Sequence, residues 1–323
     1  MNRIWVFCEQ RDNVLQPVAL ELMGAARSLA AQSEGTVGAL LLGSGVSPLA
    51  QELIACGADT VYIVDDEKLA HYTTEAYAQA ICQMVREENP ASLLFGATSI
   101  GRDLAPRISA RLRTGLTADC TKLEIDEQGS LFMTRPAFGG NLFATIICPN
   151  SRPQMSTVRP GVMPKPVRDD SRQGEIVPVT VAWQTEKLCV RVVEETKESQ
   201  SVENIEEAKL LVSCGRGVKN TEPAFELAKK MKGTVSSSRA LVDAGIMEQP
   251  RQVGQTGKTV RPQAYLAFGI SGAIQHLAGM EESEYIVAIN TDKNAPIFKI
   301  ANLGIVADAA AVMKELNKLL EEA

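Results

Sequence analysis

The sequence predicts an α/β protein of two domains, each built on a mostly parallel β-sheet with helices on both of its faces. Three observations lead to this fold class. The chain has 323 residues, a length that suits two domains. Short apolar runs alternate with helical patterns in both halves, and strands that alternate with helices form crossover units in parallel sheets. A stretch rich in proline and charge, residues 159–204, separates the halves.

In the first half, the apolar runs predict four buried strands and the segments between them predict helices. The predicted strands are residues 4–7, 37–43, 60–64 and 92–96, and the predicted helices are residues 17–32, 47–56, 71–89 and 101–112. Residues 120–158 differ, because strand-like alternation surrounds a turn at Asp126–Gly129 and a second apolar run, LFATIIC, follows. We expect this part to add antiparallel strands to the sheet.

The connecting region is predicted to hold one strand, PVTVAWQ, and then a charged linker at about 194–207. We therefore place the domains at 1–204 and 205–323. In the second domain KLLVSCG reads as a strand that enters Gly215-Arg216-Gly217, and TEPAFELAKKMKG reads as an amphipathic helix. Further strands are predicted at 265–269, 285–290 and 303–307, before a C-terminal helix. Loops at the carboxyl edge of such a doubly wound sheet can hold a dinucleotide, but no GxGxxG motif is present, which disfavours an ordinary Rossmann dehydrogenase.

Composition excludes several classes of function. The net charge of -6 and the pI near 5.3 argue against a nucleic-acid footprint, which is usually basic. The seven cysteines form no CxxC pair and the chain has two histidines, so we expect no zinc or iron–sulfur site and no disulfide framework. The N-terminus lacks the pattern of a secretory signal, and no apolar run reaches the length of a membrane span. These features predict a soluble, cytoplasmic protein.

The richest segment is residues 236–276, which contains SSSRALVDAG, VGQTGK and GISGAIQH. Each motif combines glycines, which allow close backbone approach, with hydroxyls, amides or cations. Arg239, Lys258 and His276 add positive charge. Each motif alone also has an ordinary interpretation, as a tight βα turn, a surface loop or a structural histidine. Together they suit a large anionic cofactor with a hydrogen-bonding ring.

These motifs resemble the cofactor site of the α subunit of electron-transfer flavoproteins. CGRGV, AINTD and GIVAD occur in the family's order, and GRDLAPRISARLRTGLTADC resembles the family's N-terminal domain. The resemblance implies FAD as cofactor, no catalytic residue and no metal. It implies an FAD-binding set made of Arg216, Ser238, Arg239, Val253, Gly254, Gln255, Thr256, Ser271, Gly272, Ala273, Ile274, Gln275, His276, Asn290, Asp308 and Ala309.

Within this set the resemblance gives each group a task. Ser271 and Gly272 would lie at the pyrophosphate, at the start of a helix, and Thr256 at the flavin N5 edge. Asn290 and Asp308 would contact the adenosine half, although both residue types are also common in turns and helix caps. Arg239 and His276 would hold positive charge against the flavin. One charged hydrogen bond of that kind can raise a one-electron potential by on the order of 100 mV.

The resemblance also implies a heterodimer with a β subunit and electron exchange with an acyl-CoA dehydrogenase-type flavoenzyme. Two versions stay open: a bifurcating one, in which the β subunit oxidises NADH, and a conventional one, which delivers electrons to a quinone reductase. RPQMSTVRPGVM, residues 152–163, favours the bifurcating version. Two other classes remain, a nucleotide-dependent enzyme on the same fold and an assembly protein with a vestigial site.

Overall fold

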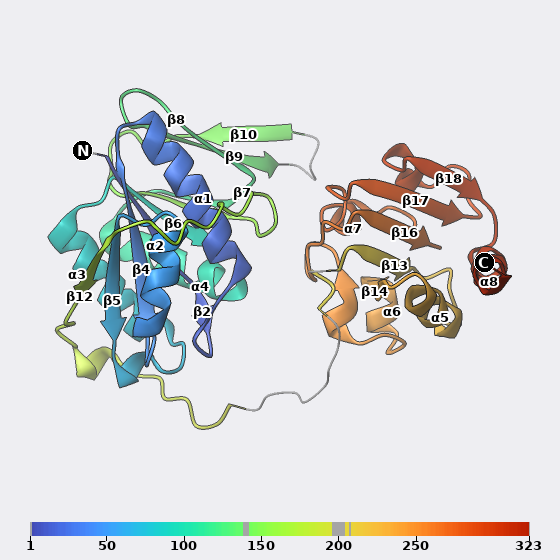
Figure 1. The fold of residues 1–323 in the computed structure, drawn as a ribbon, viewed down its shortest axis with the longest axis horizontal. Helices are drawn as coiled ribbons and strands as arrows, with labels where there is room; N and C mark the ends of the chain where they lie inside the picture. The colour runs from blue at the N-terminus through green and yellow to red at the C-terminus, as the bar shows by residue number, and fades with distance from the viewer. Residues whose placement is uncertain (1, 138–141, 196–203, 207, 323) are drawn as a thin grey trace. The chain divides into compact units, whose positions relative to one another are not determined.

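The computed structural model describes residues 2–137, 142–195, 204–206 and 208–322 (Figure 1). The chain divides into two compact units, Met1–Thr196 and Lys197–Ala323. The linker predicted at 194–207 lies mostly outside the described residues. Within the described residues, no helix is long and apolar enough to cross a membrane.

The first unit is a seven-stranded, fully parallel sheet in the order β12-β5-β4-β1-β6-β11-β7. Alternate residues of β1 point to opposite faces: Ile4 and Val6 join one core, whereas Trp5 and Phe7 join the other. Helices α1 and α2 contribute to the first core, and α3 and α4 to the second. The strands are β1 Arg3–Phe7, β4 Thr36–Gly43, β5 Thr60–Asp65, β6 Ser92–Gly96, β7 Leu116–Cys120, β11 Gln154–Val158 and β12 Glu175–Pro178; the helices are α1 Pro17–Gln32, α2 Ala50–Ala55, α3 Thr74–Glu88 and α4 Ser99–Leu112.

The antiparallel segment corrects one prediction. β8 Lys122–Ile125, β9 Leu131–Ala137 and β10 Leu142–Ile146 form a hairpin and a third strand as expected, but they make a separate three-stranded sheet. The strands that extend the parallel sheet are instead β7 and β11, which the sequence did not reveal. The reason is their composition: β11 reads QMSTV, and its Ser156 and Thr157 are polar yet fully buried.

The strand predicted for PVTVAWQ is also wrong, because β12 ends at Pro178. Residues 179–188, which we name the strap, follow without strand pairing and pack Val179, Val181 and Trp183 against the second core. Two glutamines of α3 hold the strap by its backbone. Gln79 exchanges hydrogen bonds with both the N–H and the C=O of Gln184, while Gln83 accepts from the N–H of Ala182 and donates to the C=O of Thr180.

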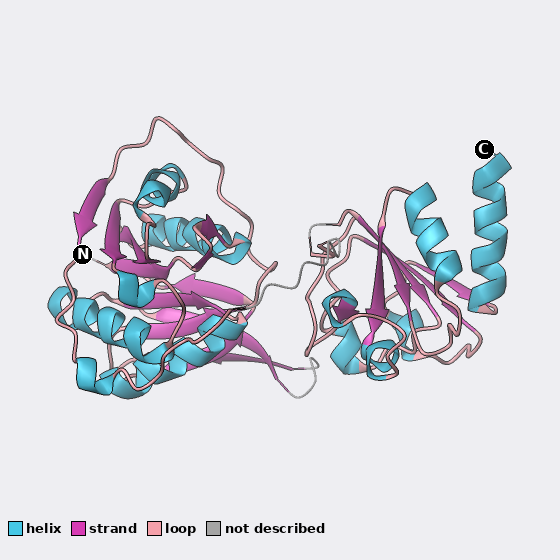
Figure 2. Cartoon of the chain, turned by 90° about the horizontal axis from the view of Figure 1, so that it is seen from below, coloured by secondary structure: helices cyan, strands magenta, loops and turns pink. Residues whose placement is uncertain are grey.

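The second unit is a six-stranded, fully parallel sheet in the order β15-β14-β13-β16-β17-β18. Helices α5 and α8 pack against each other over one face of the sheet (Figure 2). The other face is covered by Val260, Met280 and Ile297 and their neighbours. The strands are β13 Leu210–Cys214, β14 Thr234–Ser238, β15 Gln252–Val253, β16 Ala264–Phe268, β17 Tyr285–Asn290 and β18 Leu303–Val306; the helices are α5 Glu222–Lys230, α6 Arg239–Asp243, α7 Ile274–Leu277 and α8 Ala309–Glu322.

Counted along the chain, the strand order of this unit is 3-2-1-4-5-6, the order of the doubly wound dinucleotide-binding fold. The predicted fold class is confirmed for both units. β14 was not predicted as a strand, since it reads TVSSS, and its Ser236 and Ser237 are fully buried. All seven cysteines are unpaired, and five of them are buried: Cys8, Cys56, Cys82, Cys120 and Cys214.

Candidate functional site

The predicted site residues gather at the carboxyl edge of the second sheet. The strand order reverses between β13 and β16, and a crevice at that point is where doubly wound sheets bind ligands. Arg216 follows β13, Ser238 and Arg239 lie at the end of β14, and Gly254 follows β15. The segment Ser271–His276 follows β16, Asn290 ends β17, and Asp308 follows β18.

The loops after β13 and β16 touch backbone to backbone. A Cβ on Gly215 would lie 2.7 Å from the carbonyl carbon of Gly269, and one on Gly217 would lie 3.3 Å from the Cα of Gly269. Gly269 itself has φ +64°, a conformation that suits glycine. Side chains are therefore excluded where these two loops pack together at the switch point, and the amides of Gly215, Gly217 and Gly269 donate to backbone carbonyls of the chain. Arg216, between the two glycines, is exposed.

The loop Ser271–Ala273 offers backbone donors. Gly272 has φ +86°, and a Cβ there would overlap the backbone of Ile297. Within the described chain, no acceptor takes the N–H groups of Ser271, Gly272, Ala273 or Ile274. The helix that follows, α7, is a single turn of four residues, so its dipole is smaller than the sequence suggested. Successive free amides, rather than a long helix, make this loop suited to an anion.

The VGQTGK loop is fastened to the same segment. Gly254 has φ +139°, and a Cβ there would lie 2.8 Å from the carbonyl oxygen of Gln275. The N–H of Gln255 donates to that oxygen over 2.7 Å. Thr256 is exposed, and its Oγ1 accepts a hydrogen bond from the Gln252 amide at 3.0 Å. Val253, by contrast, is buried in the core below the loop.

The cations of the motifs are engaged locally. Arg239 is exposed, and its Nε lies 3.1 Å from Oδ2 of Asp243, four residues on in α6. The structure therefore does not bring Arg239 into a hydrogen bond with the neighbouring loops. Ser238 precedes it at the N-cap of α6 and makes no side-chain capping bond. Lys258 donates to Asn204 Oδ1 over 3.2 Å and lies 3.8 Å from Glu206.

His276 does not have the predicted character. The sequence suggested a cation, but the residue is only 7% exposed, and its Nε2 lies 3.0 Å from the hydroxyl of Tyr265. Burial lowers the pKa of His276 to about 4, and the backbone of Val253 acts weakly in the opposite direction without completing a hydrogen bond. The imidazole is therefore neutral near pH 7, because water is not available to solvate its charged form.

Asn290 and Asp308 act in the loops that they were predicted to line. Asn290 donates through Nδ2 to the carbonyl of Ile270 at 2.9 Å, which ties β17 to the loop after β16. Asp308 is exposed and accepts from the N–H of Ala311, so it caps α8. Ala309 is buried at the start of that helix. Both polar side chains therefore have the structural role that is common for their residue types: Asn290 hydrogen-bonds within a turn and Asp308 caps a helix.

Two residues of this region were missed from the sequence. Tyr265, fully buried in β16, hydrogen-bonds to Ser213 of β13 and to His276. The available signal was a tyrosine within the otherwise apolar strand AYLAF, since a buried tyrosine usually finds a partner for its hydroxyl.

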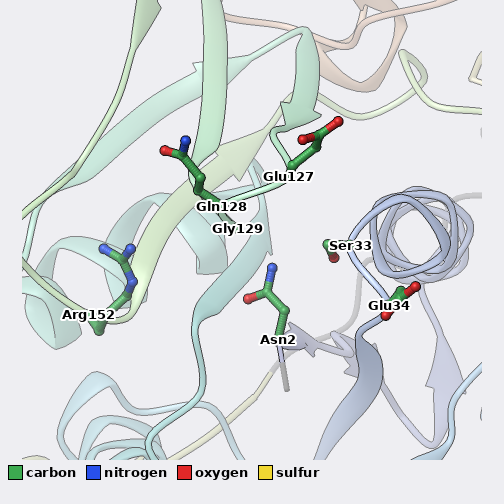
Figure 3. A pocket seen from close by; sticks show the side chains of 7 residues that line it. All are labelled: Asn2, Ser33, Glu34, Glu127, Gln128, Gly129 and Arg152. Atoms are coloured by element: carbon green, nitrogen blue, oxygen red, sulfur yellow. The ribbon is translucent and has the colours of Figure 1, made fainter.

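The first unit has a pocket of a different kind (Figure 3). Its lining is polar and comes from the amino ends of strands: Asn2 precedes β1, Glu34 precedes β4 and Arg152 precedes β11. Parallel sheets bind ligands at the opposite, carboxyl edge. In the described part of the chain, no group of three or more His, Cys, Asp and Glu side chains could hold a metal ion.

Comparisons with known proteins identify the family. The model of the electron transfer flavoprotein domain matches residues 4–183, and that of the electron transfer flavoprotein FAD-binding domain matches residues 204–281. The chain is 53% identical to the electron transfer flavoprotein subunit alpha of Thermoanaerobacterium thermosaccharolyticum, over 99% of this chain and 97% of that protein. It is 44% identical to the acryloyl-CoA reductase electron transfer subunit beta of Anaerotignum propionicum, over 99% and 95%.

A third relative is the lactate dehydrogenase (NAD(+),ferredoxin) subunit LctC of Acetobacterium woodii, at 41% identity over 98% of this chain and 77% of that protein. The resemblance inferred from the motifs is confirmed. This chain belongs to the family of electron transfer flavoprotein alpha subunits, and its second unit is the FAD-binding domain.

Proposed function

We propose that this protein is the α subunit of a bifurcating electron-transfer flavoprotein. It would pass electrons, through FAD held by the second unit, between NADH- or ferredoxin-linked chemistry in a β subunit and an acyl-CoA dehydrogenase-type flavoenzyme. The observation that carries the proposal is the run of amides at Ser271–Ile274, which have no acceptor among the described residues and lie at the carboxyl edge of the second sheet, where the strand order reverses. The first unit would serve as scaffold and as the contact for the β subunit.

The residues at this edge fit FAD. Its pyrophosphate needs donors without bulk, which the free amides of Ser271–Ile274 supply. Gly215 and Gly272 lie where a Cβ would collide with neighbouring backbone, so the chain approaches closely at the switch point. We propose that Asn290 and Asp308 line the adenosine half and that Thr256, Gln255 and Arg239 line the flavin half. The remaining members of the proposed set are Arg216, Ser238, Val253, Gly254, Ala273, Gln275, His276 and Ala309.

FAD supplies the redox chemistry when it is bound. The chain's own contribution is binding, orientation and charge. With His276 neutral, Arg239 is the cation of the proposed ring-side pair that keeps its charge. Its pairing with Asp243 is exposed, and exposed ion pairs contribute at most about 1 kcal/mol. The guanidinium can therefore exchange that partner for a ligand at small cost.

The names of two relatives favour the bifurcating version. One is a subunit of a lactate dehydrogenase named for NAD(+) and ferredoxin, and the other is an electron transfer subunit of acryloyl-CoA reductase. Residues 152–163, which favour the same version, contain β11, the strand between β6 and the edge strand β7 of the first sheet. The conventional carrier, which serves a quinone reductase, is the alternative.

An absorption spectrum of the protein purified with its β partner, followed through an NADH titration, tests the proposal. We expect two FAD per heterodimer and bleaching by NADH. One FAD that does not respond to NADH would indicate the conventional carrier. A complex without flavin that takes up no added FAD would reject both versions and favour a nucleotide-dependent enzyme.

A further inference from the structure

A buried chain of hydrogen bonds lies beneath the proposed cofactor site. Tyr265 is fully buried, and its hydroxyl lies 2.7 Å from Oγ of Ser213, which is also fully buried. The same hydroxyl lies 3.0 Å from Nε2 of His276. The two rings meet edge to face, with centroids 6.2 Å apart and planes at 62°. Three residues, on β13, β16 and α7, thus meet at one phenolic hydroxyl.

The two contacts fit one arrangement of the protons. A hydroxyl donating to an oxygen is shortest at about 2.7–2.8 Å, whereas an N–H donating to an oxygen is most often at about 2.9–3.0 Å. The Tyr265–Ser213 distance therefore fits an O–H of Tyr265 that donates to Ser213. The His276–Tyr265 distance fits an N–H of the imidazole that donates to the phenolic oxygen. Burial raises the pKa of Tyr265, opposed by smaller contributions from Ser213 and Ser236, so the phenol keeps its proton.

The other ring nitrogen has no such partner. Nδ1 of His276 is buried and, among the described residues, makes no hydrogen bond. A neutral imidazole carries one N–H and one bare nitrogen. If Tyr265 accepts the N–H of Nε2, then Nδ1 must be the bare nitrogen. The other neutral tautomer would instead place an unpaired N–H at the buried Nδ1, at the cost of desolvating that donor.

We propose that Tyr265 is a positioning residue that fixes His276 as the neutral tautomer with its proton on Nε2. The relay runs from His276 through Tyr265 to Ser213. His276 then offers only the lone pair of Nδ1, and it contributes an acceptor rather than a cation. The consequence for FAD rests on the proposed placement of His276 in the cofactor site, whereas the tautomer itself belongs to the chain alone.

The chain suits a direct test, because it has two histidines, His71 and His276. Nitrogen-15 labelling of histidine in this chain only, reconstituted with an unlabelled β partner, gives two imidazole spin systems, and the variant His71→Gln assigns them. We expect a proton bonded to Nε2 of His276 that exchanges slowly with water, and a pyridine-like Nδ1. A proton found on Nδ1, or a doubly protonated ring at pH 7, would overturn the proposal without any substitution at Tyr265.

The variant Tyr265→Phe removes only the hydroxyl. We expect its Nε2 proton to exchange at least tenfold faster and to lose the downfield shift of a hydrogen-bonded proton. Tyr285→Phe is the matched control, because Tyr285 lies on the adjacent strand β17 and is 47% exposed, so the relay should be intact. An unchanged Nε2 proton in Tyr265→Phe would reject the relay.

Removing and restoring FAD separates the two proposals. If His276 lies in the cofactor site, its ring nitrogens should shift when FAD is restored, and Tyr265→Phe should shift the flavin reduction potential while Tyr285→Phe does not. The placement of His276 in the cofactor site would be rejected if the chemical shifts of its ring nitrogens do not change when FAD is restored. If the Nε2 proton still exchanges slowly in that protein, the proposed relay would be unaffected.

Discussion

Substituting Gly272 by alanine tests the loop that is proposed to hold the pyrophosphate. Gly272 has φ +86°, which costs an L-residue about 1–2 kcal/mol. The new Cβ would also lie 2.6 Å from the Cα of Ile297, where ordinary contact is about 3.5–4.0 Å. The loop must therefore move by about 1 Å. This movement disturbs the hydrogen bond from Ile297 N–H to Ser271 C=O and the amides that face the proposed ligand.

The matched control is Gly245→Ala. Gly245 has φ +69°, but no atom lies within 4 Å of its would-be Cβ, so it carries the backbone strain without the collision. We expect Gly245→Ala to lose about 1–2 kcal/mol of stability in the second unit, and Gly272→Ala to lose more because of the collision. Only Gly272→Ala should also lose at least about tenfold in FAD affinity, which is about 1.4 kcal/mol. Fluorescence titration with FAD measures this, and equal FAD affinity in the two variants would refute the loop's role.

Three further outcomes follow from the charges. The native protein should lose stability as the pH falls from 6.5 to 4, because His276 binds a proton in the unfolded chain but not in the folded one; a folded-state pKa of about 4 makes this loss about 3 kcal/mol. His276→Gln should abolish this loss and His71→Gln should retain it, as measured by urea unfolding of the cofactor-free protein. Asp119→Asn should destabilise the first unit at pH 7 and progressively less as the pH falls below about 4, because burial would raise the pKa of Asp119 but the Arg159 guanidinium at 2.7 Å outweighs burial and lowers that pKa. A destabilisation that does not shrink as the pH is lowered would contradict this reading. Arg239→Gln and Asp243→Asn should each change stability by less than about 1 kcal/mol, and only Arg239→Gln should lower the FAD reduction potential; the same potential in both variants would remove Arg239 from the ring site.

Apolar runs in the sequence predicted the strands that are apolar throughout, whereas the strands that contain polar residues were not predicted. β1, β4, β5 and β6 were predicted within a residue or two, because each is a continuous hydrophobic run between turns. β11 and β14 carry serines and threonines that are fully buried, and no periodicity distinguishes such a strand from a loop. Only pairing with neighbours on both sides makes these segments strands, and that pairing is a property of the whole sheet.

The site was predictable in position and less so in chemistry. Glycines beside polar residues at strand ends indicated the correct edge of the sheet, since close backbone approach is a local property. The charge of His276 depends mainly on its burial in the folded chain, so its residue type alone suggested a cation that the fold does not allow. The length of α7 could not be predicted from the sequence either, because the motif GISGAIQH marks where a helix begins but not that it ends after one turn.

The strap has a practical consequence for dividing the gene. The family match to the first unit ends at residue 183, inside the strap. A fragment that ends at residue 183 would keep the hydrogen-bond partners of Gln83 but would lack Gln184, whose backbone hydrogen-bonds to the Gln79 side-chain amide. A fragment that ends after β12 would also expose the apolar surface against which Val179 and Val181 pack. A fragment that continues through Leu188 retains both glutamine pairs and the apolar contacts of Trp183 and Leu188. Helix α3, more than the last strand, therefore decides where a separately expressed first unit should stop.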